Sequence, residues 1–303
     1  MIKSILLYMS DQPRLQQMAT KMKVSRLVAR RFVAGESTDD AIRAILTLNK
    51  SGFTATLDYL GENITKLEEA SHATHEYVSA VDKIQQASAD SNVSLKLTQF
   101  GLALDEAACA LNAEKVVQRA AGFNNFVRID MEGSAFTDPT LRVFTALRMK
   151  YENVGIVIQA YLFRSEKDIE DMLQLKSRIR LCKGAYKEPP EISFKKKSDT
   201  DANYIKLMKI LLKSGIYHGI ATHDPHMIQA TKEFVRQENI GKNEFEFQML
   251  YGIRRDLQEK LIHEGYRLRI YVPYGEEWYS YLMRRMAERP ANLMFVVRNL
   301  FRG

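Results

Sequence analysis

Two adjacent arginines near the end of the chain have the chemistry and the spacing of a carboxylate receptor. Residues 276–288 read EEWYSYLMRRMAE, and helical spacing aligns four side chains at positions i, i+3, i+4 and i+7, namely Tyr281, Arg284, Arg285 and Glu288. Two guanidinium groups beside a phenol can form a fork that binds both oxygens of a carboxylate. A solvated basic stripe with an internal Arg284–Glu288 pair fits the same pattern, so both interpretations stay open at this point.

Two charged residues stand inside apolar runs. Lys96 lies in the run VSLKL, and Asp130 lies in the run VRIDM. Because burying a charge is costly without a partner, each of them must either form an ion pair or serve a ligand. The pattern is equally consistent with a functional role and with a structural ion pair.

The segment 180–186, RLCKGAY, is a third candidate. It places one cation, Arg180, on a predicted strand and a second, Lys183, three residues later. Gly184 follows, and a glycine lets the backbone approach a ligand closely. This combination suits an anionic ligand such as a phosphate or the edge of a flavin ring. A Lys-Gly turn that leaves a strand explains it equally well.

The sequence lacks the residues and motifs on which several other kinds of metal or catalytic site depend. The two cysteines, Cys109 and Cys182, are too few for a disulfide scaffold or a thiolate metal site, and they favour a reducing compartment. His223 and His226 flank a turn through a proline and lack further nearby ligands, so we expect no metal there. The chain contains no Walker A, G-x-S-x-G or H-E-x-x-H motif.

Short β-rich runs supply the elements that must position these residues. Eight of them lie at 53–57, 93–97, 126–131, 155–160, 179–183, 218–222, 245–250 and 268–272. Charged segments of helical period separate them, among them 166–176, 204–213 and 226–238. Repeated βα units of about 30 residues predict an α/β fold, a closed TIM-like (β/α)8 barrel. An open doubly wound sheet is the alternative, but it usually carries a Gly-rich turn, and no G-x-G occurs here.

A closed barrel would bring distant polar residues together, because active sites of this fold lie at the carboxyl ends of the strands. The polar residues at the predicted strand ends include Asp58, Glu62, Lys96, Asp130, Gln159, Arg180, Thr222, His223, Gln248 and Tyr271. We therefore expect one constellation built from several strands.

Length and composition fit one such barrel with a helical extension. The chain has 303 residues, of which 46% are hydrophobic and 27% charged. We predict an N-terminal helical segment over 1–50 that packs on the barrel, with Ser37 or Thr38 capping a helix, and a catalytic barrel over 51–303. No apolar run approaches the ~18 residues of a membrane span, and the start lacks a secretory signal, so we expect a cytoplasmic protein. The net charge of +7 is mild and does not by itself favour nucleic-acid binding.

Several short motifs in order along the chain carry a family resemblance. They are LDYLGE (57–62), LKL (95–97), IDME (129–132), QAY (159–161), RLCKGAY (180–186), ATH (221–223), EFQMLYG (246–252) and YVPYG (271–275), followed by the helix with its two arginines. Each is weak alone, but together they resemble the proline dehydrogenase family over most of the chain. The chain is similar to the single-function bacterial members, since no length remains for the aldehyde dehydrogenase module of bifunctional relatives.

The resemblance implies oxidation of L-proline to Δ1-pyrroline-5-carboxylate, with hydride transfer to FAD, on a distorted (β/α)8 barrel. It implies that Asp130 and Arg180 form the catalytic centre, with Arg180 at the reactive edge of the flavin and Asp130 orienting Lys96. The implied proline-binding residues are Lys96, Arg284, Arg285, Tyr271, Tyr281, Tyr186 and Leu250. The implied FAD-binding residues are Met131, Gln159, Arg180, Lys183, Gly184, Ala185, Thr222 and His223.

We also expect a gate over the substrate site and several partners. Glu62 follows the first strand and Arg284 lies on the last helix, so an ion pair between them could close over bound proline. The resemblance implies a quinone as electron acceptor, peripheral contact with the inner face of the cell membrane, and transfer of the product to a separate pyrroline-5-carboxylate dehydrogenase. The competing interpretations are a Schiff-base aldolase that uses Lys96 or Lys183, and a basic protein that binds membranes or nucleic acid.

Overall fold

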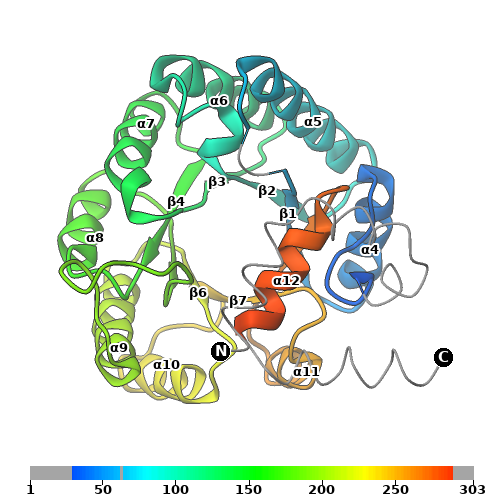
Figure 1. Cartoon of the computed structure of the whole chain (residues 1–303). Coiled ribbons are helices and arrows are strands. Elements are labelled where there is room, and N and C mark those ends of the chain that lie inside the picture. Colours follow the sequence, from blue (N-terminus) through cyan, green and yellow to red (C-terminus); the bar gives the residue numbers. More distant parts are fainter. Residues whose placement is uncertain (1–28, 62–63, 289–303) are drawn as a thin grey trace.

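The computed structural model describes residues 29–61 and 64–288, with the side chains of 284–288 left out (Figure 1). Its centre is a closed barrel of eight parallel strands in the order β1 to β8. The strands are β1 Thr54–Tyr59, β2 Ser91–Leu95, β3 Val127–Ile129, β4 Val154–Gln159, β5 Ile179–Cys182, β6 His218–Ala221, β7 Phe245–Leu250 and β8 Leu268–Tyr274. All eight predicted strands and the closed barrel are confirmed.

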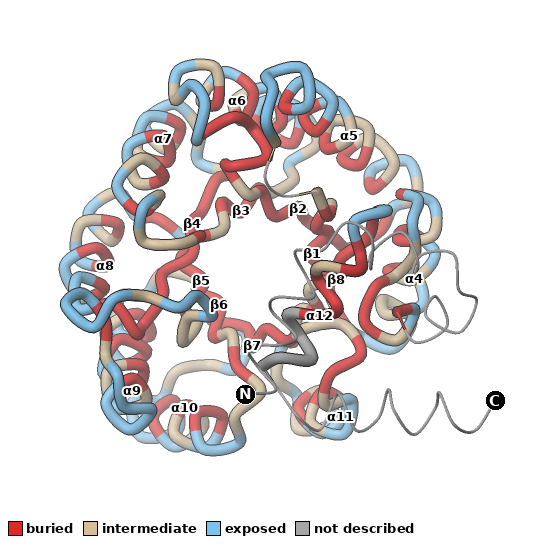
Figure 2. Tube along the Cα trace, in the orientation of Figure 1, coloured by how far each residue is buried: buried red, intermediate tan, exposed pale blue. Residues whose placement is uncertain are grey.

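Helices surround the barrel (Figure 1). They are α4 Thr38–Lys50, α5 Leu67–Gln86, α6 Glu106–Ala121, α7 Thr137–Lys150, α8 Ser165–Gln174, α9 Lys197–Lys213, α10 Pro225–Gln237, α11 Arg255–His263 and α12 Trp278–Glu288, with short 3-10 turns at Leu97–Phe100 and Ser134–Phe136. Figure 2 shows the inward sides of the outer helices buried and their outward sides exposed, as expected for amphipathic helices.

The strands are largely buried because both faces of the parallel barrel sheet are covered. Every residue of β4 is buried, and so is every residue of β2. The barrel closes where β1 pairs with β8, from Thr54 opposite Arg269 to Tyr59 opposite Tyr274. β3 is shorter than the predicted run and ends before Asp130, which therefore stands at the carboxyl end of the barrel.

The predicted cap before α4 is confirmed. The Ser37 hydroxyl accepts a hydrogen bond from the backbone N–H of Asp40 at 3.2 Å, and the Asp40 carboxylate accepts one in return from the backbone N–H of Ser37. This reciprocal pair is a capping box, which fixes the start of the helix. α4 packs against β1 and β8, on the seam that closes the barrel.

α12 covers part of the carboxyl end. Its buried Trp278, Leu282 and Met283 pack with Phe32 from the N-terminal segment and with Leu60 after β1. The predicted helix is thus confirmed, with Trp278 and Leu282 on its buried side. Residues 1–28 of the expected N-terminal segment lie outside the described residues.

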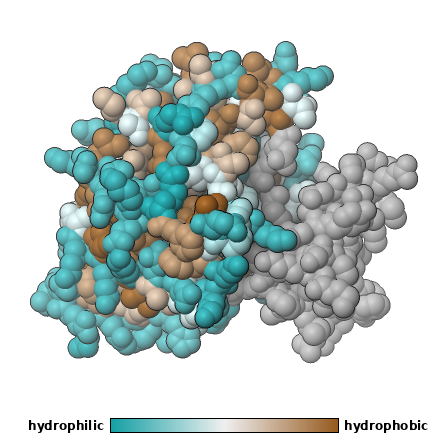
Figure 3. All heavy atoms as spheres, turned by 60° about the vertical axis from the view of Figure 1, so that its left-hand side comes forward, coloured by the Kyte–Doolittle hydropathy of each residue, from teal (hydrophilic) through white to brown (hydrophobic). Residues whose placement is uncertain are grey.

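Within the described ranges, no helix is both long and apolar enough to cross a bilayer. The face drawn in Figure 3 is mainly hydrophilic, with scattered hydrophobic side chains.

Candidate active site

A buried ion pair joins the first two strands at the carboxyl end of the barrel. The Lys96 ammonium, just after β2, lies 2.6 and 2.8 Å from the two carboxylate oxygens of Asp58 in β1. Their side chains are only 12% and 1% exposed. The pair holds the Lys96 ammonium at the mouth of the barrel, where a ligand carboxylate could reach it.

A second ion pair crosses the barrel from β3 to β5. Asp130 Oδ1 lies 2.8 Å from Arg180 Nη1 and accepts a hydrogen bond from the Ser94 hydroxyl at 2.7 Å. Its other oxygen accepts a hydrogen bond from the Tyr271 hydroxyl at 2.7 Å. The Nε of Arg180 donates to Gln248 in β7. Five strands thus fix this charged centre, and its geometry is held before any ligand arrives.

Tyr271 connects the two ion pairs. Its hydroxyl donates to Asp130 and lies 3.4 Å from the Lys96 ammonium, which also sits 5.9 Å from the centre of the Tyr271 ring. Burial raises the pKa of Tyr271 well above its usual value, and the nearby carboxylates of Asp130 and Asp58 add to this effect. The phenol therefore stays protonated and remains a hydrogen-bond donor.

The carboxylate that directly holds Lys96 is Asp58, whereas we expected Asp130 to orient it. The reason lies in the strand order: Asp58 stands on β1, beside β2, and Asp130 turns across the barrel toward Arg180. Asp58 and Gln248 were noted as polar strand-end residues but were given no role. A carboxylate in the otherwise uncharged strand TATLDY was the available signal for Asp58.

Arg180 retains an unused donor in the site. Its side chain is 6% exposed, and within the described part of the chain its buried Nη2 has no hydrogen-bond partner. Burying an N–H group without a partner is costly. This orphaned donor is what a site for an electron-rich ring edge or an anionic group would present.

Several expected cofactor residues lie at this same end, with Gln159 as the last residue of β4 and Thr222 and His223 just after β6. Gln159 donates a hydrogen bond to the backbone carbonyl of Glu132 at 2.8 Å. His223 accepts one through Nε2 from the backbone N–H of Leu250 at 2.9 Å. The Thr222 hydroxyl accepts one from the N–H of Asp224 at 3.0 Å. These bonds tie the loop after β3 to the end of β4, and the loop after β6 to the end of β7, beside the Arg180 centre.

Lys183 makes ion pairs that the sequence did not indicate. Its ammonium contacts Asp201 and lies 2.8 Å from Asp224. Burial by itself would raise the pKa of Asp224, but the hydrogen bonds from Lys183 and from the backbone of His226 outweigh it and lower that pKa to about 2. The carboxylates therefore fix the position of Lys183 at the carboxyl end of β5.

Gly184 is required by packing within the chain. Its φ of +109° is unfavourable for other residues, and an added Cβ would lie 2.1 Å from the Tyr161 ring. We expected close approach to a ligand there, and the described contact is with an aromatic side chain. Ala185 and Tyr186 follow on an exposed loop, tied down where Glu188 accepts a hydrogen bond from the backbone N–H of Ser134 at 2.8 Å.

Some of the remaining candidate site residues lie within the described part of the structure, and others lie outside it. Met131 and Tyr281 are buried, and Leu250 is half-buried beside the α12 cluster. Glu62 and the side chains of Arg284 and Arg285 lie outside the described residues, so the gate and the arginine pair stay predictions. The backbone of α12 does place positions 284 and 285 on a helix next to the mouth of the barrel.

The fold and the paired charges define a (β/α)8 barrel with an enzyme-type site at the carboxyl ends of its strands. The family model for proline dehydrogenase matches residues 41–298. The chain therefore belongs to the proline dehydrogenase family.

Curated relatives and a solved structure match this chain over most or all of its length. Proline dehydrogenase 1 of Bacillus subtilis (strain 168) is 42% identical over 302 residues, which cover all of both chains. Proline dehydrogenase of Deinococcus radiodurans is 40% identical over 306 residues, covering 99% of this chain and 98% of the relative. The crystal structure of proline utilization A from Bdellovibrio bacteriovorus, inactivated by N-propargylglycine, matches with a TM-score of 0.83 and 26% identity, over 94% of this chain and 38% of that one.

Proposed function

We propose that the protein oxidises L-proline to Δ1-pyrroline-5-carboxylate with FAD as its cofactor. The observation that carries this proposal is the buried Asp130–Arg180 pair with the unpartnered Nη2 of Arg180. A fixed cation of this kind stabilises negative charge that develops on a bound group. Family membership supplies the substrate class.

The residues at the carboxyl end fit a flavin. When bound, FAD supplies the two-electron oxidation and passes the electrons to an acceptor such as a quinone. Arg180 would direct its free N–H to the cofactor while Asp130 and Gln248 hold the guanidinium still. The residues proposed to line the cofactor are Met131, Gln159, Lys183, Gly184, Ala185, Thr222 and His223.

Proline would be held by its carboxylate and by the sides of its ring. Lys96, positioned by Asp58, is proposed to bind the carboxylate together with Arg284 and Arg285. The phenol of Tyr271, anchored on Asp130, would form one wall of the ring site. Tyr186, Tyr281 and Leu250 are the other proposed wall residues.

The proposal also includes a gate over the site and the partners that take the electrons and the product. Glu62 would pair with Arg284 and close the mouth of the barrel. Electron transfer to a quinone would require peripheral contact with a membrane, which the net charge of +7 would favour on anionic lipid. The curated relatives include the bifunctional protein PutA of Escherichia coli (strain K12), 29% identical over 321 residues, which cover 90% of this chain and 24% of that protein. By analogy, the product would pass to a pyrroline-5-carboxylate dehydrogenase.

An aldolase is the weaker alternative. A Schiff-base enzyme needs a neutral lysine as nucleophile. The ammonium groups of Lys96 and Lys183 are each held by carboxylates, Lys96 by Asp58 and Lys183 by Asp224. Such contacts suit a fixed cation that binds an anion.

Product formation tests the proposal. The purified protein, given L-proline and an artificial electron acceptor, should form Δ1-pyrroline-5-carboxylate, trapped as a coloured adduct. Arg180→Met should abolish most of this activity, and Arg142→Met, at an exposed arginine paired with Glu106, should not. Absence of product from folded, flavin-loaded protein would contradict the proposal. Borohydride trapping of a carbonyl substrate on Lys96 would favour the aldolase.

A further inference from the structure

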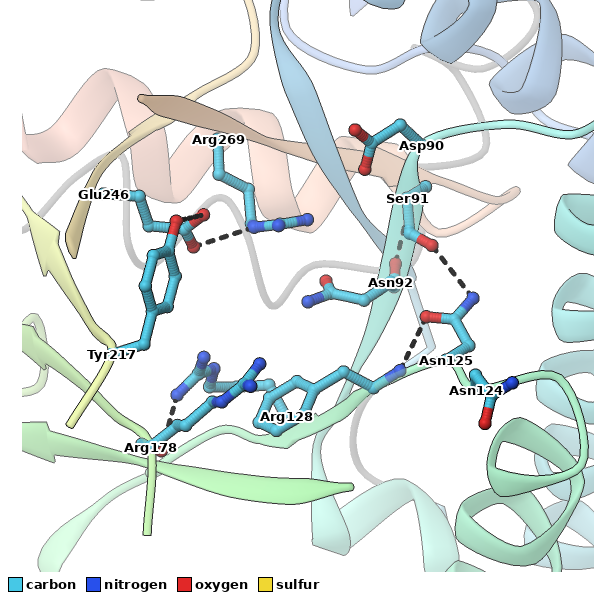
Figure 4. Close-up of a pocket in the computed structure, with 11 residues that line it drawn as sticks. Asp90, Ser91, Asn92, Asn124, Asn125, Arg128, Arg178, Tyr217, Glu246 and Arg269 are labelled. Carbon is cyan, nitrogen blue, oxygen red and sulfur yellow. Dashed lines mark hydrogen bonds and ion pairs between the residues drawn. The ribbon is translucent and has the colours of Figure 1, made fainter. Parts of the chain in front are cut away.

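A polar cavity lies at the opposite end of the barrel from the Arg180 centre. It encloses about 130 Å³ and is lined by residues at or just before the amino ends of the strands, including Asn92 of β2, Arg128 of β3 and Arg269 of β8 (Figure 4). Asn92, Arg128 and Glu246 are buried, whereas Arg178 at its edge is exposed. The cavity therefore runs inward from the surface at the end of the barrel that the proposed reaction does not use.

Two of its arginines have no carboxylate partner. Arg128 is 3% exposed, and its Nη1 donates to the backbone carbonyl of Arg178 at 2.8 Å. Its buried Nε has no hydrogen-bond partner in the part of the chain that the structure describes. The guanidinium groups of Arg128 and Arg178 lie 4.9 and 5.3 Å from the centre of the Phe126 ring. Among the described residues, neither forms an ion pair.

Two carboxylates line the cavity, and that of Glu246 is already engaged. Glu246 Oε1 lies 2.8 Å from Arg269 Nε and accepts a hydrogen bond from Gln248 at 2.5 Å. Its other oxygen accepts a hydrogen bond from the Tyr217 hydroxyl at 3.1 Å. Glu246 thus balances Arg269. The exposed Asp90 also lines the cavity, so its three arginines and two carboxylates leave a surplus of one positive charge.

The electrostatic environment of Arg128 is consistent with this excess of positive charge in the cavity. Burial lowers the pKa of Arg128 to about 9. The guanidiniums of Arg180 and Arg269 add to this effect, and the carboxylates of Glu246 and Asp130 oppose it without cancelling it. Arg128 is therefore still charged near neutral pH. A buried cation that no carboxylate contacts directly is costly, and an anion in the cavity would offset that cost.

We propose that this cavity binds one small tetrahedral oxyanion of the phosphate type. A cavity of about 130 Å³ has room for a small free ion. Figure 4 shows Arg269 across the cavity from Arg128 and Arg178, so N–H donors face the centre from different sides. The Asn92 carbonyl oxygen accepts a hydrogen bond from Thr56 at 2.5 Å, which leaves its amide N–H groups for the ligand. Guanidinium groups are the preferred protein donors to such oxyanions.

Calorimetric titration of the full-length protein with sodium phosphate tests this site, at constant ionic strength set with sodium chloride. We expect one phosphate per chain, with a rise in Tm as phosphate is added. Arg178→Gln removes an exposed cavity arginine and should weaken phosphate binding about tenfold or more, because it deletes a charged hydrogen-bond donor to the ion. Arg128→Met should abolish binding if the variant folds.

The matched control is Arg142→Gln, which removes the same charge from the exposed Arg142–Glu106 pair on the helical surface. It should bind phosphate like the parent protein. Phosphate binding that is equal in the parent and in Arg178→Gln would overturn the proposal, because the ion would then be held elsewhere. Equal stabilisation by chloride at the same ionic strength would overturn it as well.

Discussion

Asp130 Oδ1 lies 2.8 Å from Arg180 Nη1, and this buried pair ties β3 to β5 at the carboxyl end of the barrel. Asp130→Asn removes the charge that balances Arg180 while keeping the side-chain size. Breaking one partner of a buried pair leaves an uncompensated charge, so the free energy of unfolding should fall by about 3 kcal/mol, and proline oxidation should slow. Denaturant unfolding and steady-state kinetics measure both effects.

The control for that variant is Asp138→Asn, in the exposed Asp138–Arg164 pair. It should cost at most about 1 kcal/mol, as surface ion pairs do. Equal losses of unfolding free energy in the two variants would show that the buried Asp130–Arg180 pair contributes no more to stability than an exposed ion pair.

Arg285 is predicted to bind the carboxylate of proline. Arg285→Met keeps much of the side-chain volume and deletes the charge, so kcat/KM for proline should fall roughly tenfold or more. Flavin content should stay near that of the parent protein. Arg142→Met serves as the charge-matched control and should leave kcat/KM unchanged. Loss of flavin with unchanged kinetics in the remaining loaded enzyme would assign Arg285 to the cofactor instead.

Gly184 should resist substitution because of Tyr161. Gly184→Ala introduces both an unfavourable positive φ and a Cβ placed 2.1 Å from the ring. Gly215→Ala is the matched control, because φ is also positive, at +71°, but nothing lies within 4 Å of the added atom. The control should cost ~1–2 kcal/mol, and Gly184→Ala at least ~1 kcal/mol more from overpacking. Equal Tm values for the two variants would mean that the ring moves aside freely.

His218 should make stability depend on pH. Burial, reinforced by the charge of Arg128, lowers the pKa of His218 to about 3 in the folded state. The unfolded state, with a pKa near 6.5, then binds more protons between these values. The contribution of His218 is therefore complete above about pH 6.5 and is lost as the pH falls, by ~1.4 kcal/mol per unit.

Urea titrations at pH 7 and pH 5 measure this effect. The parent protein should lose about 2 kcal/mol between them through His218, and His218→Gln should lose much less. His226→Gln, at an exposed histidine of α10, should behave like the parent. A parent protein whose stability is the same at both pH values would contradict the burial argument.

The barrel was predictable because its signal is local. Apolar runs at a βα spacing identify the strands, and β7 begins and ends at the predicted residues. The partners of the charges were less accessible, because they depend on which strands are neighbours. Asp58 and Lys96 are 38 positions apart in sequence and meet because β1 pairs with β2.

The same limit explains the residues that sequence reasoning missed. Gln248 reaches Arg180 across the barrel from 68 positions away, and no local pattern records that approach. The glycine at 184 was recognised as special, but Tyr161 is its cause, which only the packing reveals. The cavity of Arg128, Arg178 and Arg269 is assembled from three separate strand starts, so its charge surplus is invisible along the chain.

The most direct test of the central claim is an absorbance spectrum of the purified protein during anaerobic addition of L-proline. We predict the bands of an oxidised flavin before addition, their bleaching as proline is added, and Δ1-pyrroline-5-carboxylate equal in amount to the flavin reduced. An oxidised flavin spectrum that persists at saturating proline would contradict the assignment of this barrel as an FAD-dependent proline oxidase centre.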